Sequence, residues 1–410
     1  ELSDDEILSE FVASRLPEGL ISGLKTYLKT VDTPLAVRSS SKLEDSNYQP
    51  FAGVYSTYMI PHVDNKDMML RILDKAIKSV YASVFYNGSR TYIQTTGNLQ
   101  SEEKMAVVIQ NICGSEHNGL YYPLISGVGR SVNFYPIGGE RMEDGIVNVV
   151  FGLGKSVVEG GKTLRFSPEF PKKILQLSQP YLAVRDSQKM MFALDLRPGA
   201  FKISRNEGVN LAHIPVTEVI PDYANSNLVF STYSAVDSRI VPGVEESGAR
   251  IVSFDAILKY GKYPLAKALS EIMDICRKEL LCEVEIEFAA DVAPSGKLSL
   301  KLLQVRPISS YSAEQEVNFD ELKAYNNSKG VDAYKIVEGI QPIAFENAVW
   351  AYTTGAAIAI KKGSKNAAEA AENIGIGLQS FCIPGSVADS RDVGLGHGNL
   401  GAMLLREETK

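Results

Sequence analysis

Two stretches of alternating apolar and polar residues constrain the fold of this chain more than any other feature. Residues 282–290 read CEVEIEFAA and residues 298–307 read LSLKLLQVRP. Alternation with a period of two is typical of a strand with one buried face and one polar face. The intervening residues 293–297, APSGK, have the composition of a turn. The pattern therefore predicts a β-hairpin whose two strands share a polar face.

The length of the turn determines which residues of this hairpin face each other. We expect a two-residue loop at Ser295-Gly296. The polar face then carries two facing pairs, Glu287 opposite Gln304 and Glu285 opposite Arg306. The opposite face, which points into the core, carries Ile286, Phe288, Leu303 and Val305. A slip of one residue would break this arrangement, because it moves every side chain to the other face.

The hairpin alone leaves two interpretations of its polar face. Ion pairs across the strands of a solvated sheet are common and contribute ~0–1 kcal/mol. Alternatively, carboxylates and a Gln carbonyl are hard oxygen ligands suited to Mg²⁺, and Arg can hold a phosphate through two hydrogen bonds. Taken by itself, the hairpin favours the ion-pair interpretation.

A second polar stretch follows a short apolar run near the N-terminus. Residues 36–53 read AVRSSSKLEDSNYQPFAG. We expect a strand over Asp32–Val37 and a partner strand over Phe51–Ile60. An Arg followed by serines is more often a solvated turn, in which hydroxyls cap backbone N–H groups. This stretch alone therefore does not indicate a binding site.

The remaining periodic segments indicate a mixture of helices and strands. Spacings of three and four residues predict helices, and near-continuous apolar runs predict buried strands. The expected helices are Lys66–Phe85 and Leu265–Leu281, and the expected strands are Lys104–Ile112 and Ile146–Phe151, the latter closed by a Gly152–Gly154 turn. The chain is therefore expected to be an α+β protein.

Composition excludes several classes of protein. The formal net charge of −7 argues against a general binder of nucleic acid or of an anionic membrane. The longest apolar stretch, Ala348–Ile360, is too short to span a bilayer, and no signal peptide is visible. The four cysteines form no Cys-x-x-Cys pair and indicate free or buried thiols in a reducing compartment, so we expect a cytoplasmic protein.

Two glycine-rich stretches approach phosphate-binding motifs without matching them. Residues 149–156, VVFGLGKS, lack the first glycine of a P-loop, and Gly160-Gly161 interrupts any following helix. Residues 396–401, GHGNLG, fit G-x-G-x-x-G only by letter, since no strand precedes them. Neither stretch is interpreted as a nucleotide motif.

In their order along the chain, the motifs resemble the N-terminal ATP-binding domain of the phosphoenolpyruvate synthase and pyruvate phosphate dikinase family. The ordered set is specific even though each motif alone is weak. The matching segments are Val37–Ser41, Glu44-Asp45, Phe51–Gly53, the apolar strand Met105–Gln110, Gly152–Gly154, Glu285–Ala289 and Leu303–Pro307. The resemblance covers roughly residues 15 to 310, and it reverses the interpretation of the hairpin in favour of a metal–nucleotide site.

The resemblance implies an ATP-grasp-like α+β fold that holds ATP between two lobes. Arg38 and Arg306 would clamp the phosphates. Glu285, the third residue assigned to catalysis, would support Glu287 and Gln304. Gly53 and Thr57 would lie along the triphosphate. The remaining implied contacts are Gln110, Asn111 and Ile112 at the adenine edge, and Glu287 and Gln304 at Mg²⁺ or the ribose. Such a site performs phosphoryl transfer by positioning and charge neutralisation.

The family passes the phosphates of ATP to a histidine on a separate domain, and a third domain then makes phosphoenolpyruvate from pyruvate. Neither a Thr-Ser-His phosphocarrier motif nor a barrel domain is present in this sequence. The family's Gly-Gly-Lys segment is absent as well, and Glu1 suggests a fragment or a processed chain. Ser41 and Glu285 are mild departures from the family's Ala and Asp. Alternatives are the ATP domain of a rifampin phosphotransferase or glucan dikinase, or a non-catalytic nucleotide-binding module.

The C-terminal part differs in amino-acid composition from the rest of the chain. Residues 319–410 resemble the N-terminal part of the uncharacterised GGGtGRT protein family, and we expect a mainly helical segment there. We place a boundary near residue 313, which separates an ATP-binding domain at residues 1–313 from this segment at residues 314–410. The junction is expected to be chimeric, with a natural fusion as the alternative.

Overall fold

The structure is a computed structural model that describes residues 2–41, 55–95, 104–158, 160–197, 201–234, 239–308, 348–353 and 356–361. The chain divides into two compact units. The first comprises residues 1–132 and 144–309, and the second comprises residues 133–143 and 310–410. The first unit mixes helices and strands, which confirms the expected α+β class for that part of the chain.

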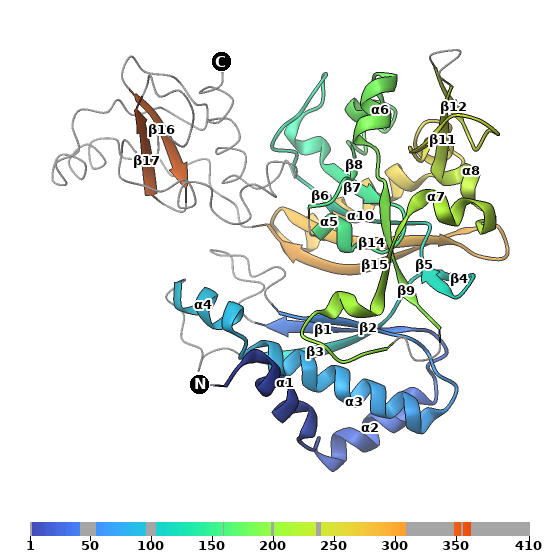
Figure 1. Ribbon diagram of the computed structural model, residues 1–410. Helices are drawn as coiled ribbons and strands as arrows, with labels where there is room; N and C mark the ends of the chain where they lie inside the picture. Colours follow the sequence, from blue (N-terminus) through green and yellow to red (C-terminus); the bar gives the residue numbers. More distant parts are fainter. Residues whose placement is uncertain are drawn as a thin grey trace. The chain divides into compact units, whose positions relative to one another are not determined.

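A three-stranded antiparallel sheet with the order β2-β1-β3 forms the N-terminal lobe of the first unit (Figure 1). Helix α3 packs on one face of this sheet, and α1 and α2 pack on α3. The lobe consists of α1 (Asp4–Ala13), α2 (Glu18–Leu28), β1 (Leu35–Ser41), β2 (Thr57–Ile60), α3 (Lys66–Ser83), α4 (Asn87–Thr95) and β3 (Met105–Asn111).

Alternation along β1 gives this sheet two different faces. Leu35 and Val37 are fully buried in the same core cluster as Met69 and Leu73 of α3. Each such burial contributes roughly 1.5–3 kcal/mol, which fixes the register of β1. Ala36 lies on the other face, in a separate apolar cluster. Arg38 follows two residues later and therefore points away from α3.

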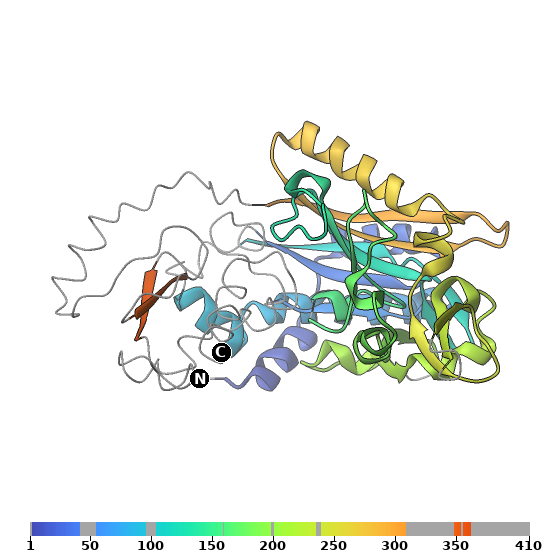
Figure 2. The same ribbon diagram turned by 90° about the horizontal axis from the view of Figure 1, so that it is seen from above.

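A five-stranded antiparallel sheet with the order β15-β14-β6-β7-β8 forms the second layer of the unit. Figure 2 shows helix α10 on one side of the β14–β15 hairpin and the N-terminal strands on the other. Leu269 and Met273 of α10 pack with Ile286 and Phe288 of β14 in the main core. The elements are β6 (Ile125–Arg130), β7 (Ile146–Val150), β8 (Leu164–Phe166), α10 (Leu265–Leu280), β14 (Val284–Val292) and β15 (Leu298–Pro307).

The expected pairs of the hairpin are present, but the turn is different. Glu285 faces Arg306 and Glu287 faces Gln304, as the sequence predicts. The loop, however, holds three residues instead of two, because the Ala293 N–H donates to the Lys297 carbonyl and Gly296 adopts a φ of +77°. A left-handed residue at this position is typical of three-residue hairpin loops.

A β-bulge restores the register that the longer loop would otherwise shift. The ladder changes between Glu287 and Phe288, so that Leu302 pairs with Phe288 and Leu303 is the extra residue. Val305 packs against the core as expected, and Leu303 is half-buried. Without the bulge, Gln304 and Arg306 would face the core instead of the polar side.

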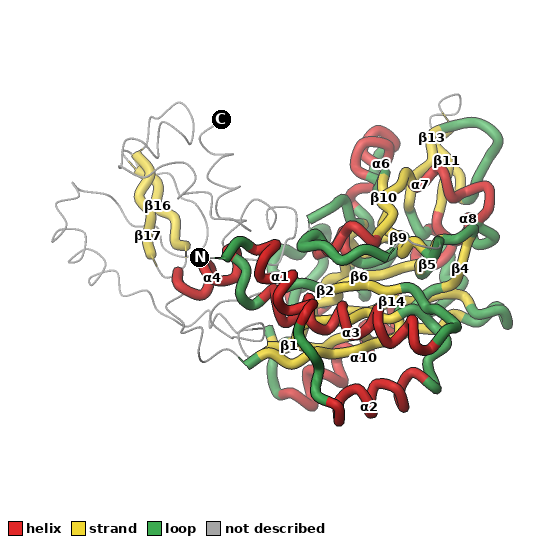
Figure 3. The backbone as a smooth tube through the Cα atoms, turned by 60° about the horizontal axis from the view of Figure 1, so that its bottom comes forward, coloured by secondary structure: helices red, strands yellow, loops and turns green. Residues whose placement is uncertain are grey.

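Two smaller sheets complete the first unit; Figure 3 colours them by secondary structure. The sheet β10-β9-β5-β4 joins β4 (Ser115–His117), β5 (Leu120–Tyr122), β9 (Met190–Asp195) and β10 (Leu211–Pro215). The sheet β12-β11-β13 joins β11 (Phe230–Ser234), β12 (Arg239–Pro242) and β13 (Ala249–Val252). The short helices are α5 (Lys155–Val158), α6 (Pro180–Asp186), α7 (Val216–Val219), α8 (Ser226–Val229) and α9 (Asp255–Leu258).

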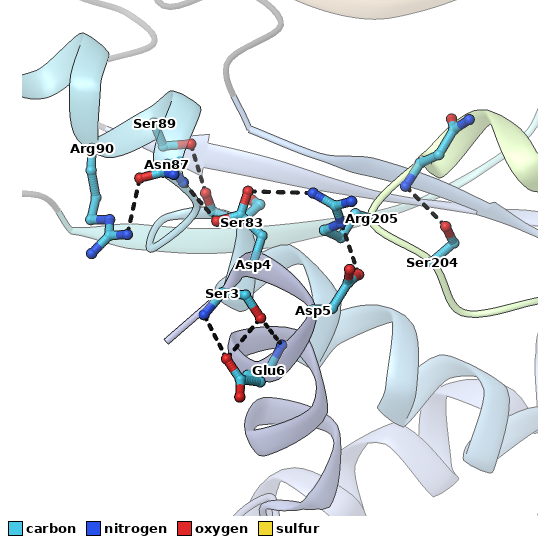
Figure 4. Close-up of polar contacts among 11 residues, drawn as sticks. Ser3, Asp4, Asp5, Glu6, Ser83, Asn87, Ser89, Arg90, Ser204 and Arg205 are labelled. Carbon is cyan, nitrogen blue, oxygen red and sulfur yellow. Dashed lines mark hydrogen bonds and ion pairs between the residues drawn. The ribbon is translucent and has the colours of Figure 1, made fainter. Parts of the chain in front are cut away.

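The connection between β9 and β10 reaches back to the N-terminal helices. The Ser204 carbonyl accepts a hydrogen bond of 2.8 Å from Tyr58 Oη. Arg205 forms ion pairs with Asp4 at 3.6 Å and with Asp5 at 2.8 Å, both in the first turn of α1 (Figure 4). This connection therefore links the start of α1 to the strand β2 through polar contacts.

In the second unit, the structure describes one antiparallel pair of strands, β16 (Ala348–Thr353) and β17 (Ala356–Lys361). The expectation of a mainly helical C-terminal segment is not confirmed, because the elements described there are strands. The rest of residues 309–410 lies outside the described ranges. Within those ranges, no helix is long and apolar enough to cross a membrane.

Candidate nucleotide site

Arg38 meets the polar face of the hairpin directly. Its Nη2 atom donates hydrogen bonds of 2.8 Å to Glu287 Oε2 and of 2.8 Å to Gln304 Oε1. The side chain of Arg38 is 24% exposed and that of Glu287 is 17% exposed, so the cluster is accessible from solvent. The fold thus brings together three residues that lie far apart in the chain. All three were assigned to one site from the sequence.

Glu285 lies between two arginines in the middle of the sheet. It faces Arg130 of β6 on one side and Arg306 of β15 on the other. Glu285 Oε2 accepts a hydrogen bond of 2.7 Å from Arg130 Nε. Glu285 Oε1 accepts one of 2.7 Å from Arg306 Nε and pairs with Arg306 Nη2 at 2.5 Å. The three side chains form a row of alternating charge across three strands.

The two arginines keep Glu285 ionised despite its burial. Burial raises the pKa of this carboxyl, but the guanidinium groups of Arg130 and Arg306, with their hydrogen bonds, outweigh it and lower the pKa below the ordinary value. Burial lowers the pKa of Arg306 and the Glu285 carboxylate raises it, with a net increase. All three groups are therefore charged at neutral pH.

Gln110 bridges the two sheets beside this cluster. It faces Ala36 in the β1–β3 ladder, and its Nε2 atom donates a hydrogen bond of 3.0 Å to the carbonyl of the bulged Leu303. The residue after β3, Ile112, is buried with Ala36 and Leu153 in an apolar cluster. These residues place one polar side chain and an apolar surface near the hairpin.

Three of the other residues assigned to the nucleotide lie in the described part of the chain. Thr57 faces Arg38 in the β1–β2 ladder, and Asn111 faces Leu35 in the β1–β3 ladder. The backbone of Ile112 already has partners, since its N–H donates to the Pro34 carbonyl and its carbonyl accepts from Tyr121 Oη. Gly53 lies outside the described residues.

The Gly-Leu-Gly turn packs closely against β9. Gly152 has a φ of +88°, and an added Cβ would lie 2.7 Å from the Phe192 carbonyl oxygen. The Leu153 N–H donates to that same carbonyl. Only the four-residue helix α5 follows, which agrees with the rejection of a P-loop.

Arg130 is the member of the cluster that the sequence pattern did not indicate. Its side chain is 8% exposed, and it carries the third positive charge beside two carboxylates. The five groups, Arg38, Arg130, Arg306, Glu285 and Glu287, therefore have a net charge of +1. The sequence offered a signal only in the Arg that ends the short strand ISGVGR, because pairing between β6 and β14 cannot be read from it.

The cluster suits an anionic ligand that is held together with a cation. Glu287 and Gln304 direct two oxygens at one positively charged nitrogen, and such oxygens are also ligands that Mg²⁺ prefers. Among the described residues, no group of three or more His, Cys, Asp and Glu side chains is arranged to hold a metal ion. A divalent cation at Glu287 and Gln304 would therefore need further ligands, such as phosphate oxygens and water.

Comparison with known proteins assigns most of the chain to one protein family. Residues 2–327 match the family model described as pyruvate phosphate dikinase, AMP/ATP-binding domain, and the chain belongs to this family. It contains the ATP-binding domain of a phosphoenolpyruvate synthase-like or pyruvate phosphate dikinase-like protein. Residues 301–410 match the model of the GGGtGRT protein family, which confirms the second resemblance.

Curated relatives match different shares of the chain. A phosphoenolpyruvate synthase of Aeropyrum pernix is 25% identical over 332 residues, which are 77% of this chain and 34% of the relative. A probable phosphoenolpyruvate synthase of Archaeoglobus fulgidus is 30% identical over 31% of this chain and 14% of the relative. A rifampicin phosphotransferase of Bacillus cereus is 28% identical over 38% of this chain and 16% of the relative. The chain thus spans at most about a third of these relatives.

Proposed function

We propose that the chain binds ATP with Mg²⁺ between β1 and the β14–β15 hairpin and supplies a phosphoryl group to a histidine on another domain. The observation that carries the proposal is the convergence of Arg38, Glu287 and Gln304 on one point, next to the Glu285–Arg306 pair. Phosphoryl transfer needs cationic groups around the phosphates and oxygen ligands for a metal ion, and this cluster contains both.

Arg38 and Arg306 would hold the phosphates. Arg38 would exchange its hydrogen bonds with Glu287 and Gln304 for bonds to a phosphate oxygen, while Arg306 stays anchored on Glu285. Glu287 and Gln304, once released by Arg38, would hold Mg²⁺, which neutralises charge on the phosphates. The protein groups would act by orientation and electrostatic stabilisation.

The remaining contacts would orient the rest of the nucleotide. Thr57 lies opposite Arg38 and would border the triphosphate together with Gly53. Gln110 and the apolar surface at Ile112 would face the adenine, with Asn111 beside them. Because the Ile112 backbone already makes hydrogen bonds, the Gln110 side chain is the stronger candidate for the polar contact with the base.

The reaction that we propose is that of a dikinase. Separate domains bind ATP, carry the histidine that receives the phosphoryl group, and bind pyruvate. A phosphoenolpyruvate synthase gives the match that covers most of the chain, and this supports pyruvate as the final acceptor. The match to a rifampicin phosphotransferase supports a second candidate, with the same ATP chemistry and a different acceptor. A non-catalytic module would bind ATP without forming phosphohistidine.

Isothermal titration calorimetry with ATP and Mg²⁺ tests the binding step. We expect the unaltered chain to bind and Arg38→Met to weaken binding by about tenfold or more, because a charged hydrogen-bond donor contributes roughly 1.5–3 kcal/mol. Arg185→Met is the matched control, since Arg185 is 65% exposed and pairs with its neighbour Asp186. Equal affinities of the Arg38 and Arg185 variants would exclude Arg38 from the site. Incubation with ATP and a supplied histidine domain then distinguishes a transferase from a binding module.

A further inference from the structure

Arg130 occupies a position that direct contact with a phosphate does not explain. Its side chain is 8% exposed, and its Nε atom is 2.7 Å from Glu285 Oε2. The strand pairing places it on the far side of Glu285 from Arg306. A buried Arg two strands away from the hairpin's outer strand acts on a ligand only through its neighbours.

The hydrogen bonds around Glu285 show what Arg130 changes. A carboxylate and an Arg commonly pair through two parallel hydrogen bonds that use both carboxylate oxygens. Here Arg130 takes Oε2, so that both Nε and Nη2 of Arg306 share the single oxygen Oε1. The Glu285 charge is thereby divided between two guanidinium groups.

This division alters the charge that Arg306 presents to a ligand. Arg306 is 26% exposed, and among the described residues its Nη1 atom has no hydrogen-bond partner. With Arg130 present, the row Arg130–Glu285–Arg306 has a net charge of +1. Without Arg130 the row would be neutral, and Glu285 could close both oxygens onto Arg306.

We propose that Arg130 is a positioning residue that balances Glu285 and thereby leaves Arg306 a net positive charge for the phosphates of ATP. This inference rests on the proposed ATP site and adds to it a residue on a third strand. Arg130 does not touch the nucleotide. It determines the net positive charge that the Glu285–Arg306 pair presents to the phosphates.

A set of charge variants tests the proposal by calorimetric titration with ATP. Arg130→Met makes the row neutral, and Glu285→Gln makes it +2. The double variant R130M/E285Q returns it to +1. We expect R130M to weaken ATP binding by about tenfold, and we expect R130M/E285Q to recover affinity to within about threefold of the unaltered chain. Arg130→Lys retains the charge and is expected to lose less than R130M.

A purely structural role for Arg130 predicts a different pattern. The double variant, which breaks both contacts, would then bind ATP no better than R130M, and this result would overturn the proposal. An R130M variant with unchanged ATP affinity would also overturn it. Thermal unfolding of each variant identifies any that fails to fold. If R130M fails, E285Q alone, which raises the row to +2, replaces it and is expected to bind ATP more tightly than the unaltered chain; weaker binding would then overturn the proposal. If the unaltered chain binds no ATP, the proposed function fails and the inference falls with it.

Discussion

Replacing Glu287 with Gln should change ATP binding in opposite directions with and without Mg²⁺. Glu287 accepts a hydrogen bond of 2.8 Å from Arg38. Without the metal, the Glu287 carboxylate repels the triphosphate and competes for Arg38. With the metal, the same carboxylate is proposed as a ligand. Glu287→Gln therefore removes a repulsion in the first case and a metal ligand in the second.

The expected change in the free energy of ATP binding follows from the position of the Glu287 charge. A unit charge about 6 Å from a phosphate contributes roughly 0.7 kcal/mol in water and about 3 kcal/mol at an effective dielectric constant near 20. The Glu287 side chain is 17% exposed, which places the site between these limits. We expect Glu287→Gln to tighten metal-free ATP binding by about 1–2 kcal/mol, which is roughly five- to thirtyfold. With Mg²⁺, we expect binding to weaken by about tenfold.

Calorimetric titrations in EDTA and in excess Mg²⁺ measure both effects. Glu271→Gln is the control, because it removes the same charge from α10, on the opposite side of the sheet. Glu271 is 64% exposed and lies 3.8 Å from Lys267 in a surface ion pair. The control should change neither titration. If Glu287→Gln weakens binding equally in both solutions, Glu287 acts only as a structural partner of Arg38, and the reasoning is wrong.

Three further predictions concern the scaffold. Gly152→Ala should lower the free energy of unfolding by about 2–4 kcal/mol in urea titrations, because a Cβ at a φ of +88° meets the Phe192 carbonyl; a loss below about 1 kcal/mol would contradict this. Burial raises the pKa of Cys113 to about 11, so iodoacetamide at pH 8 should modify it about a hundredfold more slowly in the folded than in the unfolded chain; equal rates in peptide mapping would refute this. Arg205→Ala should lower stability by less than about 1 kcal/mol, because its pairs are half-exposed, and a larger shift of the urea midpoint would show that they anchor α1.

The sequence predicted several local elements and the facing pairs of the hairpin. Alternation in the hairpin predicted the pairs Glu285–Arg306 and Glu287–Gln304, and both are present. The helix expected over Lys66–Phe85 is observed as Lys66–Ser83, beginning after the N-cap Asn65. Periodicity works in these cases because one face of each element must be buried.

The two facing pairs of the β14–β15 hairpin were predicted correctly, although the length of its loop was not. The loop is one residue longer than expected, and the bulge at Leu303 compensates for it. A bulge depends on how both strands pack against their neighbours, and sequence alternation alone does not reveal it. The carbonyl of the bulged residue is also the one that receives Gln110, so the irregularity contributes a contact between the two sheets.

The sequence could not predict which distant strands lie side by side or which distant side chains contact each other. Arg130 reaches Glu285 only because β6 lies next to β14, although the two residues are far apart in the chain. The direct contact of Arg38 with Glu287 and Gln304 was likewise not expected, since those residues were assigned to different parts of the nucleotide. Both contacts arise from how the sheets and strands assemble. The boundary near residue 313 remains a prediction, and the two family matches overlap over residues 301–327.

The most direct test of the central claim is a crystal structure of the chain with Mg²⁺ and a non-hydrolysable ATP analogue. We expect the triphosphate between β1 and the β14–β15 hairpin, with Arg38 and Arg306 on phosphate oxygens and the metal on Glu287 and Gln304. The hydrogen bonds of Arg38 to Glu287 and Gln304 should then be broken. A nucleotide bound elsewhere, with those 2.8 Å hydrogen bonds intact, would contradict the assignment of the site.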